Sequence, residues 1–344
     1  MQIQTPSTPL INQTLQSIGA CLPGLGICTL LALLAWQLGE ALPLIGAPVL
    51  AILLGLLIGN LLPLDASTRI GIDFSVSKLL QWAIVGLGLK LSVAQLWAVG
   101  SHSLSVTLIT LSVAFVSALL LGRWLRLSLP LTLLIGAGTA ICGGSAIAAI
   151  APILRPKERD LMLALTTIFL FNLVAVLVFP PLGHLLHLSD SGFGLWAGTA
   201  INDTSSVVAA AYSYSQQAGD YATIVKLTRA SLILPVCLLL GLFMHWQRGK
   251  PSAAAPWHAV FPWFILGFVL ASALHSAGLL PAALEAQLIT LSHFLLVMAL
   301  VAVGLNSKLR ELRLAGARPL LLGLIVWVLV ATSSLGVQLW QGSW

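Results

Sequence analysis

A short polar run interrupts the apolar stretch between residues 192 and 216. It reads Asn202, Asp203, Thr204, Ser205. A carboxylate in apolar surroundings costs several kcal/mol unless it is paired, hydrated or protonated. Asp203, with Asn202 beside it, is therefore the leading candidate for ion coupling, as a proton carrier, a cation ligand or the partner of a buried base. Alternatively, Asp203, Thr204 and Ser205 are helix caps, and a cap inside an apolar stretch implies a broken helix.

A second interruption lies between residues 130 and 154, where Gly143 and Gly144 are followed by Ser145. Glycine is a weak helix former, so the pair favours unwinding. Unwound backbone is tolerated in a membrane only where protein or water covers it, and a break here would expose the amides that begin a second half-helix. Such amides attract anions. With the hydroxyls of Thr204 and Ser205, these residues form the predicted substrate-binding site; close helix packing through small residues is the alternative.

Two cations, Lys226 and Arg229, lie near the beginning of the apolar stretch 221–246. One interpretation is that both side chains reach out to the membrane interface. The other is that Arg229 turns inward and pairs with Asp203 or with the substrate, because a guanidinium binds sulfate, sulfonate or carboxylate through two parallel hydrogen bonds. On the second interpretation Arg229 belongs to the predicted substrate-binding set.

Secondary candidates lie along the same stretches or at helix ends. They are Thr139, Cys142, Thr166, Thr199, Lys90 and Asn306. Lys90 is expected to be an interfacial anchor, and Thr166 is expected to face the stretch 130–154. The four cysteines are widely spaced without zinc-ligand spacing, so no metal or cofactor is expected. The absence of HExxH, phosphate-loop, dinucleotide and GxSxG motifs argues against an enzyme.

The composition indicates which elements position these residues. Of 344 residues, 58% are hydrophobic and 8% are charged, against about 25% charged in a soluble domain. The mean hydropathy is +1.02. A membrane-spanning helix needs roughly 20 apolar residues, which predicts an all-α membrane protein, a single domain over residues 1–344 with eleven spans. These lie near 22–39, 43–62, 78–98, 101–121, 130–154, 159–182, 192–216, 221–246, 257–276, 281–305 and 318–338.

The distribution of basic residues gives an orientation. Residues 1–20 form a polar tail, and 22–39 is an extra N-terminal helix that is not expected to be a cleaved signal peptide. If eleven spans alternate, most loop Lys and Arg residues fall on the side of the N-terminus, which is then cytoplasmic. The cluster 155–159 falls on the other side and disagrees. The net charge of +6 thus reflects loop position and does not indicate a nucleic-acid partner.

Two internal similarities are present. Val-Gly-Leu-Gly-Leu-Lys-Leu-Ser (85–92) resembles Val-Ala-Val-Gly-Leu-Asn-Ser-Lys (301–308), seven spans later. An odd offset inverts the copy in the membrane, which is typical of secondary transporters. Gly-Thr-Ala-Ile occurs at both 138–141 and 198–201, with a serine seven residues after the glycine. Two full spans at this even offset would be parallel, so either one helix is broken or re-entrant, or the match reflects similar chemistry alone. The predicted repeats cover 43–182 and 192–338.

The segments 138–152 and 200–210 resemble the YeiH-type bacterial membrane proteins, a family labelled as sulfate exporters, and the similarity covers nearly the whole chain. It implies a fold similar to bile-acid/sodium symporters and cation/proton antiporters, with inverted repeats, a panel and a core, and crossed broken helices. Homodimers are common in that fold by analogy. The family motif has a histidine before the aspartate, where this chain has Asn202, so this chain lacks the residue on which a histidine-based proton coupling would depend.

The sequence therefore predicts a secondary transporter in the bacterial inner membrane that exports a small, sulfate-like anion by alternating access, with proton or sodium as the coupling ion. Three alternatives stay open. One is a cation-coupled symporter of an organic anion, the second is a passive anion channel, and the third is a membrane sensor subunit that transports nothing.

Overall fold

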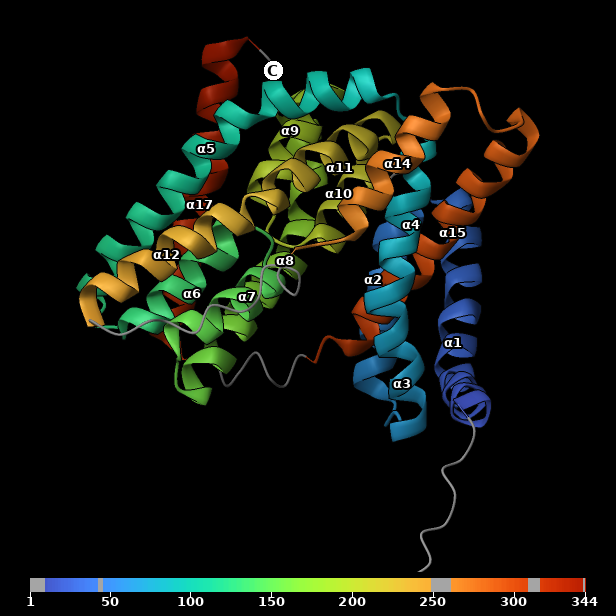
Figure 1. Cartoon of the computed structure of the whole chain (residues 1–344), viewed down its shortest axis with the longest axis horizontal. Coiled ribbons are helices and arrows are strands. Elements are labelled where there is room, and N and C mark those ends of the chain that lie inside the picture. The colour runs from blue at the N-terminus through green and yellow to red at the C-terminus, as the bar shows by residue number, and fades with distance from the viewer. Residues whose placement is uncertain (1–9, 43–45, 249–260, 309–315, 343) are drawn as a thin grey trace, which may run out of the picture.

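The computed structural model describes residues 10–42, 46–248, 261–308, 316–342 and 344, and in these residues the chain is a set of helices without strands (Figure 1). Seven helical segments in this part are long and apolar enough to cross a membrane, and several shorter apolar helices accompany them. The expected all-α membrane fold is confirmed. The helices form two bundles, one on each side of Figure 1, with separate apolar clusters.

The smaller panel bundle contains α1 (Leu10–Ala41), α2 (Gly46–Leu61), α14 (Phe264–Ser276) and α15 (Ala282–Asn306). It also contains one continuous helical segment made of α3 (Ala66–Phe74), a π-helical turn (Ser75–Leu79), α4 (Leu80–Leu87) and a 3-10 turn, η2 (Gly88–Lys90). Helices α2 and α15 lie in backbone contact because glycines face each other: a Cβ on Gly55 would be 2.2 Å from the Val301 carbonyl oxygen.

The larger core bundle holds the predicted site. Its helices are α5 (Val93–Trp124), α6 (Leu129–Ala140), α7 (Gly144–Leu154), α8 (Glu158–Leu185), α9 (Asp190–Ala200), α10 (Thr204–Tyr214), α11 (Gln216–Ser231), α12 (Ile233–Arg248) and α17 (Ala317–Gln341). Both polar interruptions break a helix as expected, between α6 and α7 and between α9 and α10.

Each broken segment turns back instead of continuing across the bundle. The Ser128 hydroxyl, which caps α6, donates to Asp160 in the first turn of α8 at 2.7 Å, so α7 has returned to the side where α6 began. Tyr214 at the end of α10 donates to the Leu188 carbonyl just before α9 at 2.6 Å and stacks on Phe193 with ring centroids 4.0 Å apart. The expectation of two crossed broken spans is therefore wrong in this detail: α6–α7 and α9–α10 are re-entrant hairpins.

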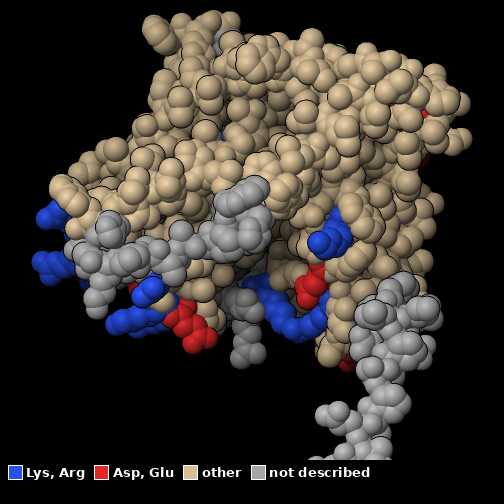
Figure 2. Space-filling model, in the orientation of Figure 1, with Lys and Arg blue, Asp and Glu red and all other residues tan. Residues whose placement is uncertain are grey.

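The two hairpins enter from opposite sides. Their bases are separated by the 28 residues of α8, a length of about 42 Å at 1.5 Å per residue. The base of α6–α7 lies at the beginning of α8, and the base of α9–α10 lies at its end. Re-entrance also removes the charge conflict of the eleven-span scheme, because Arg155, Lys157 and Arg159 now lie on the side where α5 ends. Figure 2 shows Lys and Arg side chains gathered along one edge of the molecule, and the surface hollowed between the bundles there.

The packing pattern has an internal two-fold relation. Exchanging α2 with α14, α3–α4 with α15, α5 with α17, α6–α7 with α9–α10 and α8 with α11–α12 leaves most packed pairs unchanged. For example, α5 on α6 becomes α17 on α9, and α6 on α8 becomes α9 on α11. One inverted relation thus accounts for both sequence similarities, including the even offset of the Gly-Thr-Ala-Ile repeat. The order of the elements along the chain differs, because the second copy begins with its hairpin.

Several predicted boundaries shift. The span predicted at 78–98 is the helical segment Ala66–Lys90, and the span predicted at 101–121 is α5, which begins at Val93. The reason is local: Ser67, Arg69 and Asp73 make the first turns of α3 polar, and Ser92 forms a capping box with Gln95 that starts α5. Helix α1 begins at Leu10, inside the predicted tail; residues 1–9 and 257–260 lie outside the described residues.

The contact between α2 and α15 yields a stability prediction. A Cβ on Gly304 would lie 2.3 Å from the Ile52 carbonyl oxygen, so Gly304→Ala must separate two helix backbones. We expect a loss of about 1–3 kcal/mol, the usual cost of overpacking, seen as a lower midpoint of thermal unfolding in detergent. Gly336→Ala is the matched control, because that helical glycine has nothing within 4 Å of a Cβ; an equal midpoint for both variants would contradict the packing.

Candidate functional site

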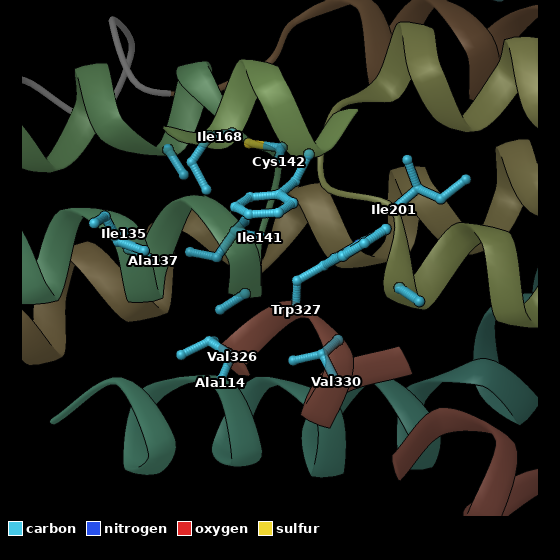
Figure 3. Close-up of a cluster of buried hydrophobic side chains, with 14 of the residues drawn as sticks. Ala114, Ile135, Ala137, Ile141, Cys142, Ile168, Ile201, Val326, Trp327 and Val330 are labelled. Carbon is cyan, nitrogen blue, oxygen red and sulfur yellow. The ribbon is translucent and has the colours of Figure 1, made fainter. Parts of the chain in front are cut away.

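The tips of the two hairpins meet inside the core bundle. Gly143 has φ 67° and ψ −126°, a backbone conformation that strongly favours glycine. A Cβ on this residue would lie 3.4 Å from the Cβ of Asp203 at the other tip. Ile141 and Ile201 from the two tips gather with Trp327 of α17 in one apolar cluster (Figure 3). Protein therefore covers the unwound backbone, as a membrane interior requires.

Lys226 on α11 joins the two tips and is fully buried. Its Nζ donates to the carbonyl oxygens of Ile141 at 2.9 Å and of Ile201 at 3.1 Å, and also to that of Asn202. An ammonium has three N–H donors and a neutral amine has two, so three carbonyl acceptors match the charged form. The interfacial position considered for this lysine is wrong.

Arg229, one turn along α11, repeats the arrangement and is also fully buried. Its Nε donates to the Ala140 carbonyl at 2.6 Å, one terminal nitrogen donates to the Ile201 carbonyl at 3.2 Å, and the other donates to the Thr139 carbonyl. The inward orientation is therefore present, but the expected pairing with Asp203 is not. Within the described residues the ion pairs are Lys90 with Asp220 and His275 with Glu285.

These contacts have a simple electrostatic origin. The last carbonyls of a helix have no partners within it and carry about half a negative charge. Helices α6 and α9 both end at the tips, so two such ends converge on α11. A buried cation costs several kcal/mol unless its donors are satisfied, and here carbonyls from both hairpins satisfy them. The two cations thus fix the relative positions of the tips.

Asp203 lies on the opposite side of the break, at the beginning of α10. Its Oδ2 accepts hydrogen bonds from the backbone N–H of Ser205 at 2.9 Å and from the Ser205 hydroxyl, so it is the helix cap that the sequence allowed. Its backbone N–H donates to Asn172 Oδ1 on α8 at 3.0 Å. The carboxylate is half-buried, and Oδ1 accepts no hydrogen bond from the described residues.

The remaining predicted binding residues differ in how deeply they are buried. Gly144 and Thr204 are half-buried, Ser145 is exposed, and Ser205 is buried and occupied with Asp203. Gly143 has no side chain with which to cap α7. The first amides of α7 therefore lie beside an exposed serine and a half-buried carboxylate.

Several buried polar atoms at the tips lack partners among the described residues. They are Oδ1 and Nδ2 of Asn202, Oγ1 of Thr139 and Nδ2 of Asn172; Oγ1 of Thr167, which lies on α8 against Gly323 of α17, also lacks a partner. Asn202 is only 1% exposed. Unsatisfied buried polar groups are uncommon in folded proteins and require an explanation. Asn172 and Thr167 were not among the predicted site residues; the polar stripe that they form on α8 was the available signal.

The other secondary candidates have structural roles or lie elsewhere. Thr199 bonds to Ser334 of α17 at 2.7 Å, and Cys142 is buried at the tip. Thr166 is half-buried. On α8, it is Ile168 that packs against the first hairpin, at Gly138 and Gly143.

Lys90 and Asn306 lie away from the tips. Lys90 forms an ion pair with Asp220 at 2.8 Å and is not an interfacial anchor, and Asn306 donates to Asp73 at 2.8 Å. Asp220 and Asp73 lie inside helices α11 and α3, so carboxylates other than Asp203 also lie within helical segments. The sequence scheme placed Asp220 in a loop between two spans.

The fold and this site define a multi-pass α-helical membrane protein with two re-entrant hairpins. The chain belongs to the family described as Conserved hypothetical protein 698, whose model matches residues 23–323. It is 45% identical to a UPF0324 membrane protein of Streptococcus pyogenes serotype M18 over 94% of this chain and 98% of the relative. It is 40% identical to one of Clostridium tetani over 79% and 83%, and 39% identical to one of Fusobacterium nucleatum over 92% and 96%.

The adjacent glycines of the first tip yield a prediction with its own control. Gly143→Ala places a Cβ on a residue with φ 67°, at a strain cost of about 1–3 kcal/mol, whereas Gly144→Ala meets only side-chain atoms at 3.7 Å or more in a helical turn. We expect Gly143→Ala to lower the unfolding midpoint and Gly144→Ala to leave it near the wild-type value. The reverse order would contradict the tip geometry.

Proposed function

We propose that this protein is a secondary transporter that exports a small, sulfate-like anion across the bacterial inner membrane by alternating access. The observation that carries the proposal is the meeting of two inverted hairpin tips around the fully buried Lys226 and Arg229. Paired broken or re-entrant helices at an internal symmetry axis are the usual construction of a midplane substrate site in carriers. Similarity to the YeiH-type exporters supports sulfate or a related sulfur oxyanion as substrate.

The charge balance of the tips supports an anion. Lys226 and Arg229 supply two positive charges, and Asp203 supplies one negative charge. The negative ends of α6 and α9 offset the positive ends of α7 and α10, since each helix end carries about half a charge. The site thus retains about one positive charge, which favours an anion and disfavours a cationic substrate.

The substrate would bind at the beginning of α7. Its first amides, at Gly144 and Ser145, have no helical acceptor, and the Ser145 hydroxyl is exposed beside them. Thr204 provides a second hydroxyl from the other hairpin. Lys226 and Arg229 would act through the field of the tips and not by contact, because protein carbonyls already occupy their donors.

Asp203 would provide coupling. Its carboxylate is half-buried and its Cβ faces Gly143 of the other hairpin. A proton or sodium ion bound at Oδ1 would cancel the negative charge beside the substrate. Binding of ion and anion would then be mutually favourable. In this proposal the N-terminus is cytoplasmic, because the helix ends that carry Arg123, Arg159 and Arg318 lie on the side where α1 begins.

The test is thermal stability of the purified protein against sulfate, sulfite, thiosulfate, taurine, citrate and bicarbonate, each as sodium and potassium salts at two pH values. A ligand at 100 times its dissociation constant stabilises the native state by about 2.7 kcal/mol. We expect a raised midpoint with a sulfur oxyanion and its loss in Ser145→Val. In Asp203→Asn, which removes the negative charge permanently, we expect the anion still to raise the midpoint, but by an amount that no longer depends on sodium or pH. Ser191→Val is the matched control, because Ser191 is also a helical serine but lies at the base of the second hairpin.

Two results would contradict the proposal. A midpoint that no anion shifts, but that sodium or pH does, would favour a cation-coupled carrier with another substrate. Anion flux in liposomes that no proton or sodium gradient drives, without counterflow, would indicate a passive channel.

A further inference from the structure

The internal two-fold relation allows each residue of one half to be compared with its counterpart in the other. The hairpins correspond at an offset of 60 residues, so Ser145, Ala148 and Pro152 of α7 match Ser205, Val208 and Tyr212 of α10. In the same way Lys90 corresponds to Asn306 and Asp160 to Asp220. A fully symmetric molecule would give each pair the same surroundings.

The two hairpins differ sharply in burial. Ser205, Val208 and Tyr212 are 2%, 0% and 7% exposed. Val208 and Tyr212 belong to the apolar cluster of the panel bundle, because α10 packs against α2 and α15. Their counterparts Ser145, Ala148 and Pro152 are all exposed, and in the described chain α7 packs chiefly on α6, α8 and α12 of its own bundle.

Polar contacts between the bundles follow the same asymmetry. Lys90 of the panel binds Asp220 of the core at 2.8 Å, the Tyr212 hydroxyl donates to the same carboxylate at 2.6 Å, and His293 of the panel meets the Tyr212 ring with centroids 5.3 Å apart. The Lys90 ammonium also lies 6.0 Å from the centroid of that ring. Lys90 and Asp220 are only 23% and 18% exposed, so water screens their attraction weakly.

Among the residues that the structure describes, the counterparts of Lys90 and Asp220 make no such contact. Asn306 donates to Asp73 at 2.8 Å within the panel, and Asp160 accepts from Ser128 at 2.7 Å within the core. Each residue is thus satisfied inside its own bundle. The contacts of Lys90, Tyr212 and Asp220 therefore join the two bundles on the side of the second hairpin, and those of Asn306 and Asp160 do not join them on the side of the first, where Figure 2 shows the surface hollowed.

We propose that Lys90, Asp220 and Tyr212 form a gate that closes the path to the hairpin tips from the side of the second hairpin. In this structure the gate is closed, and the tips are open to the side on which the first hairpin enters. This inference rests on the proposed function. In the opposite state the exposed face of α7 packs against α14, as α10 now packs against α2, and the contact between Lys90 and Asp220 opens. The bundles move relative to each other while Lys226 and Arg229 keep the tips together.

The test compares two counterpart positions by cysteine labelling, which needs no knowledge of the substrate. Cys21, Cys28, Cys142 and Cys237 are replaced by alanine, and either Ala148→Cys or Val208→Cys is introduced. A membrane-impermeant maleimide is applied separately to each side of oriented vesicles. We expect Ala148→Cys to be modified at least ten times faster than Val208→Cys, and from the side that bears the basic loops.

Opening the gate should reverse the pattern. With Asp220→Asn we expect at least a threefold faster modification of Val208→Cys, now from the opposite side, and slower modification of Ala148→Cys. Tyr212→Phe, which keeps the ring, should act in the same direction more weakly, and the exchange Lys90→Asp with Asp220→Lys should restore the original rates. Asp160→Asn is the matched control and should leave both rates unchanged.

Equal rates at the two positions, or rates that Asp220→Asn and Tyr212→Phe both leave unchanged, would overturn the gate. Failure of the proposed function is distinguishable, since a protein that responds to no anion in the thermal assay can still show the predicted labelling. Variants are compared only where they elute as the wild type does from a sizing column, and the milder Tyr212→Phe keeps the test decisive if Asp220→Asn misfolds.

Discussion

Two buried cations on one helix hold the carbonyl ends of two re-entrant hairpins, and the rest of the core bundle depends on this interaction. Lys226 and Arg229 are fully buried and donate hydrogen bonds to backbone oxygens of α6, α9 and the tips. Neither partner is stable alone: broken helix ends in a membrane leave carbonyls unsatisfied, and a lone ammonium or guanidinium there is costly. Together they satisfy each other and place four helix ends at one point.

This interaction also divides the molecule into parts with different freedom. The hairpins, α8, α11 and α17 share one apolar cluster and one polar centre, so they are expected to move as a unit. Among the described residues the panel bundle contacts that unit through α10, through the ion pair of Lys90 with Asp220, and through an apolar cluster in which Ile84 and Phe268 gather with Ile224 and Leu227 of α11. The alternating access that we propose needs a rigid site of this kind on one bundle, with the second bundle joined to it on one side at a time.

The sequence predicted the helical class and both breaks, because Gly143 and the cap at Asp203 are local features. It named a re-entrant helix only as one alternative and drew both stretches as full crossings, since hydropathy measures the length of an apolar stretch and not its direction. Two observations already conflicted with eleven full crossings: the cluster 155–159 on the wrong side, and the even offset of the Gly-Thr-Ala-Ile repeat. Lys226 was missed as a central residue because its partners are carbonyls, which every residue has, so no motif marks them.

The most direct test of this account is hydrogen–deuterium exchange of Lys226→Met in detergent or nanodiscs, compared with wild type. If Lys226 holds both tips, amide exchange will accelerate in two separated segments at once, around residues 138–147 and 198–207, while α2 and α15 stay as protected as before. Acceleration confined to α11, or to one hairpin alone, would contradict the claim that this lysine joins the two.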